Sequence, residues 1–263
     1  MVQKILFFVI ERFTGMILFI LMFALTLYFM RGGKINFIRR VPALDSIEEG
    51  IGRAAEMGRP VIASPGAAQA GINYWTIAAL SILSYVAAQC AKNDLRLLVP
   101  LGGSDQSYTL VEIARDIVEN QYTLAGRQES YKVDDLPFLS GRQFAWASAY
   151  CGMLMREKPA LNVMVGEQWA TAIYISEVSH ETGTFTLSSS TYLSNVACLA
   201  VSSDYIMIGE EMVAAGAYLS KEPVQLASIV TQDLIKALAV AFLIVGVIGL
   251  AMGSNIINVI LST

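Results

Sequence analysis

Hydrophobic residues run almost uninterrupted near both ends of the chain, whereas apolar and polar stretches alternate in between. Residues 13–30 (FTGMILFILMFALTLYFM) carry no charge, and neither do residues 237–252 (ALAVAFLIVGVIGLAM), after which the apolar character continues to Leu261. A helix needs about 20 apolar residues to cross the hydrocarbon core of a bilayer. The pattern therefore predicts two transmembrane helices: one over residues 13–30, after an interfacial segment at 1–12, and one within 234–263, which end in a short outer tail.

A cleaved signal peptide is the competing interpretation of residues 13–30. The run is long for such a peptide, and Arg31 and Lys34 follow it without a small-residue cleavage pattern, so an uncleaved span is favoured. Lysine and arginine beside a span tend to stay in the cytoplasm. Those near the two spans lie mainly on the inner side: Arg31, Lys34, Arg39, Arg40 and Lys236, against Lys4 and Arg12 outside. We therefore expect a two-pass cell-membrane protein with a cytoplasmic middle part and both termini outside.

The middle part, residues 31–233, has the pattern of a cytoplasmic α/β domain. Short apolar runs predict five strands, over residues 61–63, 95–99, 161–165, 184–188 and 205–208. Longer periodic runs predict helices that begin at Asp45 or Ser46, that cover residues 72–91, 108–124, 168–179, 192–201 and 210–219, and that run from Ser140 to about Cys151. Strands that alternate with helices form a mainly parallel sheet covered on both faces. The sequence therefore predicts a Rossmann-like, three-layer α/β domain flanked by two transmembrane helices, with a surface loop at the polar stretch 126–135.

The composition agrees with a membrane protein and excludes several functional classes. Apolar residues make up 55% and charged residues 15% of the chain, and the mean hydropathy is +0.53, far from the balance of a soluble domain. A net charge of −4 argues against a nucleic-acid partner, because such a protein needs a basic patch. Three isolated cysteines, Cys90, Cys151 and Cys198, read as buried thiols. With His180 as the single histidine, we expect no metal site and no cofactor.

Three stretches of the middle part resemble a known family. They are residues 39–61 (RRVPALDSIEEGIGRAAEMGRPV), 155–166 (MREKPALNVMVG) and 202–223 (SSDYIMIGEEMVAAGAYLSKEP), and QDLIKAL follows before the second span. Together they resemble the blocks of an uncharacterised prokaryotic family of two-span membrane proteins with a cytoplasmic domain of unknown function. The resemblance implies membrane association, but it brings no activity and no functional residues.

The first candidate site is the loop after the predicted strand at residues 61–63. Ser64–Gly71 (SPGAAQAG) contains the GxxxxG spacing of a phosphate loop, from Gly66 to Gly71. Ile72 and Asn73 stand where that motif needs a lysine and a hydroxyl, so only backbone amides and the following helix N-terminus could hold an anion. The competing interpretation is a tight loop that lets the helix pack on the sheet.

The second candidate site follows the next predicted strand. Gly102, Gly103 and Ser104 form a flexible, amide-rich turn, and Asp105 could bind a ribose hydroxyl or a metal. Parallel strands bring such loops to one carboxyl edge, where open α/β folds bind ligands. The predicted ligand-binding residues are Ser64, Gly66, Gly71, Gly102, Gly103, Ser104 and Asp105, although an ordinary turn and helix cap explain the second loop as well.

Other polar clusters have ordinary structural explanations. Residues 155–159 (MREKP) read as a solvated turn, and Glu210 and Glu211 favour the dipole of the helix that they begin. The sequence contains no nucleophile elbow such as GxSxG that could supply a serine for His180 to activate. No cluster supplies a nucleophile, a base and oxyanion donors together, so we expect no catalytic residues.

Small residues in the second span point to helix packing. Gly246, Gly249 and Gly253 let helix backbones approach closely, within one chain or between chains. With an anchor at each end of one domain, we expect a non-catalytic assembly or scaffold subunit that binds copies of itself or other membrane-complex subunits. The alternative is a membrane-tethered domain that binds an anionic nucleotide or phosphometabolite. Transport is disfavoured, because two spans without internal charge offer no midplane site.

Overall fold

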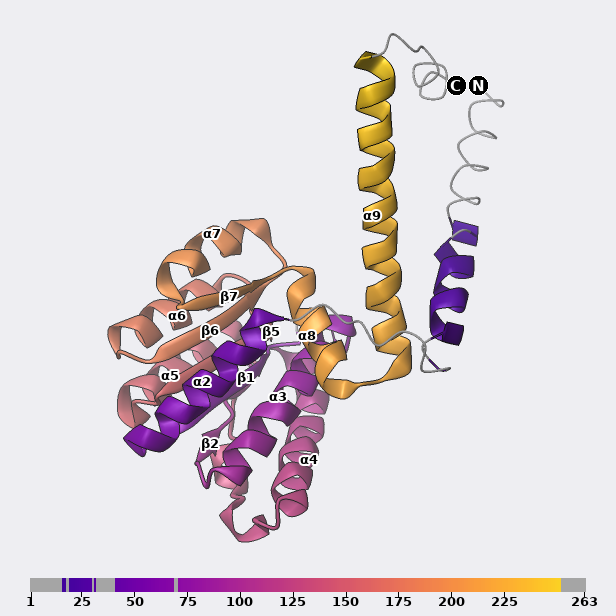
Figure 1. Ribbon diagram of the computed structural model, residues 1–263. Coiled ribbons are helices and arrows are strands. Elements are labelled where there is room, and N and C mark those ends of the chain that lie inside the picture. Colours follow the sequence, from indigo (N-terminus) through magenta and orange to yellow (C-terminus); the bar gives the residue numbers. More distant parts are fainter. Residues whose placement is uncertain (1–15, 18, 30, 32–40, 69–70, 252–263) are drawn as a thin grey trace. The chain divides into compact units, whose positions relative to one another are not determined.

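The chain forms two compact units. A computed structural model describes residues 16–17, 19–29, 31, 41–68 and 71–251 (Figure 1). The larger unit comprises Arg39–Ser220, and the smaller one joins the two chain ends, Met1–Ile38 and Lys221–Thr263.

A parallel sheet forms the centre of the larger unit. Its strands are β1 (Val61–Gly66), β2 (Leu97–Leu98), β5 (Leu161–Glu167), β6 (Phe185–Ser190) and β7 (Tyr205–Ile208). They lie in the order β2-β1-β5-β6-β7, and every neighbouring pair is parallel. This confirms the α/β class and the mainly parallel sheet. Strand order reverses between β1 and β5, which makes that gap the switch point of the sheet.

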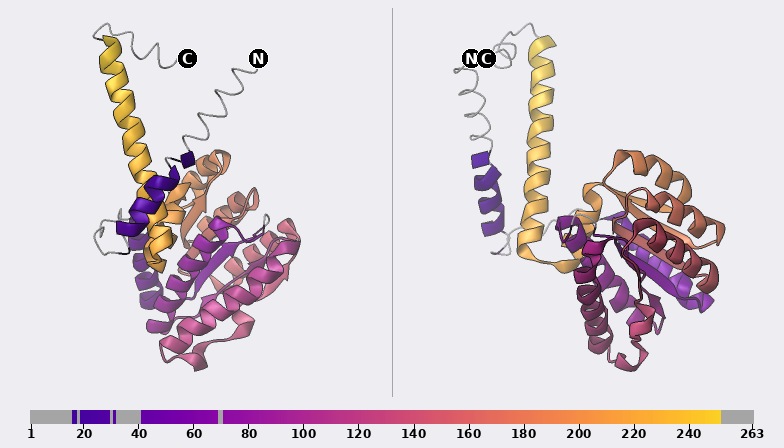
Figure 2. Two further views of the ribbon diagram at one scale, coloured as in Figure 1. Left: turned by 90° about the vertical axis from the view of Figure 1, so that its right-hand side faces the viewer. Right: turned by 180° about the vertical axis from the view of Figure 1, so that it is seen from behind.

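Helices cover both faces of the sheet (Figures 1 and 2). One face carries α2 (Pro42–Met57), α3 (Tyr74–Lys92) and α8 (Glu210–Ser220), with α4 (Tyr108–Leu124) beside α3. The other carries α5 (Gln143–Glu157), α6 (Thr171–Glu181) and α7 (Leu193–Ser202). Helices α3 and α8 approach closely because Gly216 has no side chain: a Cβ there would lie 2.8 Å from Ala78 Cα.

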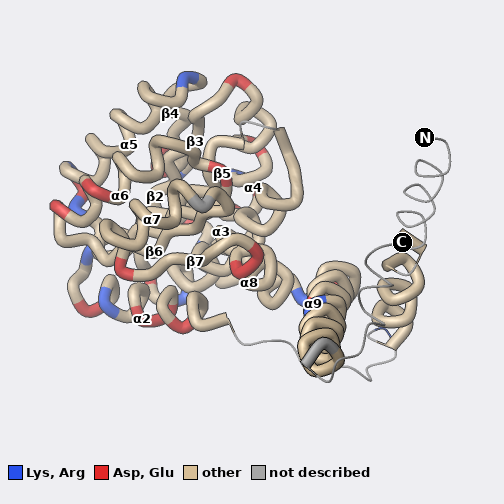
Figure 3. Tube along the Cα trace, turned by 90° about the horizontal axis from the view of Figure 1, so that it is seen from above, with Lys and Arg blue, Asp and Glu red and all other residues tan. Residues whose placement is uncertain are grey.

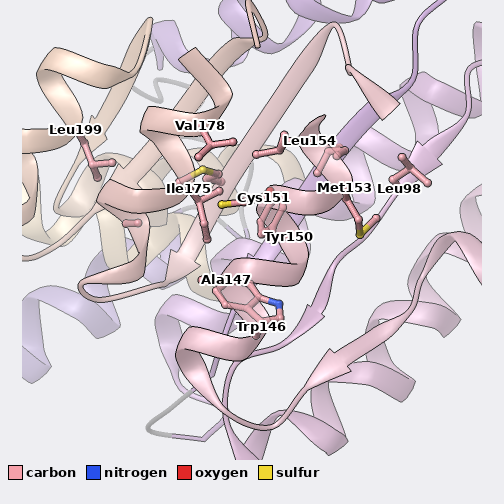
Figure 4. Close-up of a cluster of buried hydrophobic side chains, with 13 residues drawn as sticks. Leu98, Trp146, Ala147, Tyr150, Cys151, Met153, Leu154, Ile175, Val178 and Leu199 are labelled. Atoms are coloured by element: carbon pink, nitrogen blue, oxygen red, sulfur yellow. The ribbon is translucent and has the colours of Figure 1, made fainter. Parts of the chain in front are cut away.

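A cluster of buried hydrophobic side chains packs around α5 (Figure 4). Trp146 and Tyr150 are fully buried and meet edge to face, with ring centroids 5.6 Å apart. Trp146 Nε1 donates to Pro100 O at 3.2 Å, so the indole is satisfied without water. These contacts fix α5 against the edge of the sheet that carries β2.

The strand predicted at residues 95–99 is shorter in the structure, where β2 covers only Leu97–Leu98 and a second extended segment follows Pro100. Pro100 has no N–H to donate, and it separates β2 from a second short strand, β3 (Leu101–Gly102), which pairs in parallel with β4 (Phe138–Ser140). The sequence does not predict β3 or β4. Near the start of β2, Arg96 forms ion pairs with Asp135 (2.7 Å) and Glu157 (2.9 Å).

Two predicted helix starts are wrong. α2 begins at Pro42, because proline suits the first helical position, so neither Asp45 nor Ser46 caps it. α5 begins after Arg142, and Ser140 Oγ instead accepts a hydrogen bond from Arg142 N in the preceding turn. The predicted surface loop at residues 126–135 folds into two 3₁₀ turns, Gln128–Ser130 and Val133–Asp135.

The smaller unit contains a helix at residues 19–29 and α9 (Pro223–Ala251). Thr26 Oγ1 and Thr231 Oγ1 lie 2.6 Å apart, so the two helices are hydrogen-bonded to each other. Charges are sparse on α9, which carries only Asp233 and Lys236 (Figure 3).

Two of the described helices, α3 and α9, are long and apolar enough to cross a membrane. More than half of the apolar window of α3 is buried within the structure, as in a core helix, whereas none of the window of α9 is buried. Phe19–Phe29 is apolar but shorter, and the rest of the predicted span at residues 13–30 lies largely outside the described residues. Gly246 and Gly249 are partly buried, and Gly253 also lies outside the described residues.

Candidate functional site

The two predicted ligand loops lie side by side at the carboxyl edge of the sheet. Ser104 Oγ donates a hydrogen bond to Ala67 O at 2.8 Å. A Cβ placed on Gly103 would lie 2.5 Å from Ala67 Cβ, and one placed on Gly71 would lie 3.5 Å from Gln106 Oε1. The structure therefore brings together the loops that the sequence separates by about thirty residues.

Several backbone amides in the described parts of these loops already have acceptors within the chain. Gly66 N donates to Ser64 Oγ, Gly71 N to Ala68 O, and Gly103 N to Ser140 O. At the start of α3, Asn73 Oδ1 accepts from the amides of both Trp75 and Thr76, and Thr76 Oγ1 accepts from Asn73 N, which completes a capping box. These bonds support the tight-loop interpretation for the described residues of this loop, 64–68 and 71.

Backbone contacts also close the crevice between β1 and β5, where open α/β sheets take ligands. Ala67 N donates to Glu167 O at 2.7 Å across the gap. A Cβ on Gly166 would lie 2.2 Å from Pro65 O, and one on Gly66 would lie 2.6 Å from Glu167 N. Only glycine fits both positions, and both have positive φ, which glycine tolerates. The ends of the two strands are therefore in direct contact.

Asp105 packs against a turn from another part of the chain. A Cβ on Gly141 would lie 2.6 Å from Asp105 Oδ1, and Asp105 begins the 3₁₀ turn Asp105–Ser107. Ser107 closes that turn by donating from its hydroxyl to Ser104 O. The turn thus connects the second loop to residues 140–142, which precede α5.

Three residues that the sequence analysis does not single out stand at this edge, after β5 and β6. Gln168 is buried, and its Oε1 has no hydrogen-bond partner among the described residues. Trp169 has φ +46°, a conformation that is rare for a bulky residue. Its ring lies 5.2 Å from that of Tyr192, and its Nε1 donates to Glu167 Oε1. The signal available in the sequence is an aromatic residue directly after a buried strand.

The thiols nearest the core are poor nucleophiles. Burial raises the pKa of the Cys151 thiol to about 11 and that of the Cys90 thiol further, so neither forms much thiolate at neutral pH. Cys198 is exposed, contrary to the prediction of a buried thiol. Among the described residues, no three His, Cys, Asp or Glu side chains lie together as metal ligands.

The remaining polar clusters have structural roles. Glu211 Oε2 accepts from Ile208 N at the start of α8, which agrees with helix capping. Glu157 of the MREKP stretch pairs with Arg96, and Lys158 ends α5 in a left-handed conformation. His180 lies in the last turn of α6.

A buried chain of polar side chains runs beneath the sheet. Tyr150 OH donates to Asn162 Oδ1 (2.7 Å), and Asn162 Nδ2 donates to Ser179 Oγ (3.1 Å). Ser179 Oγ in turn lies 2.6 Å from Thr186 Oγ1. Burial raises the pKa of the Tyr150 phenol, which keeps the hydroxyl as a donor. Every member has a partner, so the chain fixes α5, β5, α6 and β6 in register.

Comparison with known proteins identifies a family but not an activity. Neither the curated proteins nor the solved structures contain a match to this sequence. A family described as "Domain of unknown function (DUF6754)" matches residues 3–261, nearly the whole length. The chain therefore belongs to this family of unknown function.

Proposed function

We propose that the protein is a membrane-anchored, non-catalytic assembly subunit that acts through self-association or partner binding, with both termini outside and a Rossmann-like α/β domain in the cytoplasm. The observation that carries the proposal is the surface of α9. An apolar 18-residue window of its segment Pro223–Gly249 has no buried residue, and the whole 27-residue segment is about 40 Å long at 1.5 Å per residue. In water such a surface would be strongly unfavourable, whereas lipid or neighbouring helices would cover it.

The packing of α9 supports association in the membrane. One side of the helix meets residues 19–29 through Thr231 and Ala227, both of which lie near Thr26. Gly246 and Gly249 leave a shallow face further along, and Gly253 extends it in the sequence. Small residues of this kind allow a second helix to approach closely in lipid.

The orientation rests on the flanking charges. Arg31 and Lys34 follow the first apolar run and Lys236 precedes the second, as expected for cytoplasmic flanks. A fluorescent reporter fused after Thr263 that proves to be cytoplasmic would contradict this orientation.

Sedimentation of the full chain in a mild detergent tests the assembly. We expect a particle of several chains, and we expect Gly249→Leu to shift it towards the monomer because the larger side chain separates the helix backbones. Val247→Leu is the matched control, since Val247 is two residues away and exposed. A wild-type monomer that binds no other protein of its membrane would overturn the proposal.

A second candidate function is binding of an anionic nucleotide or phosphometabolite by Ser64–Gly71 and Gly102–Ser107. The unpartnered Oε1 of buried Gln168 at the same edge favours it, because a ligand donor could satisfy that atom. The closed crevice and the occupied amides weigh against it. Full-chain protein in detergent, screened by thermal shift against nucleotides at millimolar concentration, tests it. No stabilisation by any nucleotide would overturn this candidate.

A further inference from the structure

Exposed aromatic side chains gather where strands pass into helices. Five junctions at the carboxyl edge each carry one, and we call this set the aromatic rim: Tyr74, Tyr108, Phe144, Trp169 and Tyr192. The sixth junction carries Ile208, which is also exposed. Among the described residues of Arg39–Ser220, the only other exposed aromatics are Tyr174, one turn into α6, and Tyr218. The opposite ends of the helices expose aliphatic side chains such as Leu124 and Val201 instead.

Local folding does not explain two members of the rim. Trp169 has φ +46°, where glycine or asparagine is preferred. Tyr192 occupies the N-cap of α7 without a side-chain capping bond, where serine or aspartate would stabilise the helix. Sites that depart from local preference are commonly functional sites.

The rim supplies more than half of the area that a protein contact usually buries on one partner. Its five side chains are between 43% and 69% exposed, which at about 200 Å² per aromatic ring leaves roughly 500 Å² accessible. A standard interface buries about 800 Å² on each partner. Tyrosine and tryptophan are also the residues that most often dominate binding energy at interfaces.

The net charge at the carboxyl edge of the sheet indicates which kind of partner binds there. Four carboxylates lie at the same junctions, on Asp105, Glu167, Glu210 and Glu211, and a single guanidinium, on Arg142. An acidic edge repels a second copy of itself, the anionic cytoplasmic leaflet and nucleic-acid phosphates. It attracts a positively charged segment.

We propose that the aromatic rim is the docking surface for a partner protein, which binds through an apolar segment rich in lysine and arginine. The inference rests on the proposed function, because it names the partner chemistry that the cytoplasmic domain of an assembly subunit would recognise. Aromatic rings contact the apolar side chains of that segment and the alkyl parts of its lysines and arginines. The four carboxylates raise the association rate and make binding weaken with salt.

The test uses full-chain protein in nanodiscs of neutral lipid and a displayed library of random 16-residue peptides. We expect the enriched peptides to be cationic and to contain aromatic or large aliphatic residues. Binding of an enriched peptide, measured by fluorescence anisotropy, should weaken at least tenfold in Trp169→Gly and in Tyr192→Ser. Both substitutions suit the local backbone, so the thermal midpoint should hold or rise while affinity falls.

Matched controls lie at the far ends of two of the same helices. Leu124→Ser and Val201→Ser remove exposed apolar side chains from the last turns of α4 and α7, and they should leave affinity within twofold. No enrichment, enrichment of acidic peptides, or affinity unaffected by both rim variants would overturn the proposal. A drop in the sedimenting mass of the rim variants would also overturn it, because the rim would then join copies of the chain. If only the proposed function fails, the wild-type chain sediments as a monomer and its aromatic rim still binds the peptides.

Discussion

Alanine at position 166 should destabilise the α/β unit far more than alanine at a comparable exposed glycine. Gly166 has φ +86°, and a Cβ there would lie 2.2 Å from the carbonyl oxygen of Pro65. Gly183 has φ +68°, and no atom lies within 4 Å of its Cβ position. The pair therefore separates the cost of the backbone conformation from the cost of the steric contact.

The magnitudes follow from these two terms. A left-handed conformation costs an L-residue about 1–2 kcal/mol. Alanine also reduces the conformational freedom of the unfolded chain, which stabilises the folded state by about 0.4–1 kcal/mol. Gly183→Ala should thus lower the free energy of unfolding by about 1 kcal/mol. Gly166→Ala adds the displacement of β1 from β5, and overpacking of this kind costs about 1–3 kcal/mol. We expect a total loss of about 3 kcal/mol.

Tryptophan fluorescence during urea unfolding of the full chain in detergent measures both values. All three tryptophans, Trp75, Trp146 and Trp169, lie in Arg39–Ser220, so the signal reports on that unit alone. If the two variants differ by less than about 0.5 kcal/mol, the contact between Pro65 and position 166 does not hold the strand ends together, and the closed crevice is refuted.

Three further predictions concern other parts of the structure. Thr231→Val keeps the shape of the side chain but removes the hydroxyl that meets Thr26, so it should weaken helix pairing by about 0.5–1.5 kcal/mol; an unchanged thermal midpoint of the helical circular dichroism in detergent would contradict this. Tyr150→Phe leaves Asn162 Oδ1 without its donor and should cost about 1–3 kcal/mol in urea unfolding, so a loss below 0.5 kcal/mol would count against the buried chain. The raised pKa of Cys151, about 11, means that its contribution to stability is complete below about pH 8.5, where the unfolded thiol is also protonated, and is lost as the pH rises towards 11. Stability should fall there by about 1.4 kcal/mol per pH unit for this group, and Cys151→Ala should have a correspondingly shallower fall.

The sequence predicts the fold well where buried strands meet regular helices. The fifth strand, at residues 205–208, and the helix at 108–124 coincide with β7 and α4, because each has a clear apolar pattern and flanking turn residues. Prediction fails where tertiary contacts decide. Pro100 ends β2 but does not end the extended chain, since β3 finds a separate partner in β4, and the local pattern of residues 138–140 gives no indication of that pairing.

The candidate site shows the same limit. The sequence predicts loops at Gly66 and Gly102, whereas these residues end β1 and β3, and it cannot reveal whether the backbone amides nearby are free. The amides of Ala67 and Gly103 donate to the carbonyl oxygens of Glu167 and Ser140, which are distant in the chain. Trp169 escapes notice because its left-handed backbone and its stacking on Tyr192 exist only once β5 and β6 are paired.

The closed crevice determines how any partner could use this edge of the sheet. Small-molecule sites are concave and bury most of their ligand, but the contact of Pro65 with Gly166 fills the usual concavity at the switch point. Binding is left to the outer surface, where the aromatic rings stand, and such a surface suits a broad contact with a polypeptide. Trp169 follows Gly166 by three residues, so displacing the end of β5 would also move its ring relative to that of Tyr192. Gly166→Ala should therefore lose peptide affinity together with stability, whereas Gly183→Ala should keep the affinity.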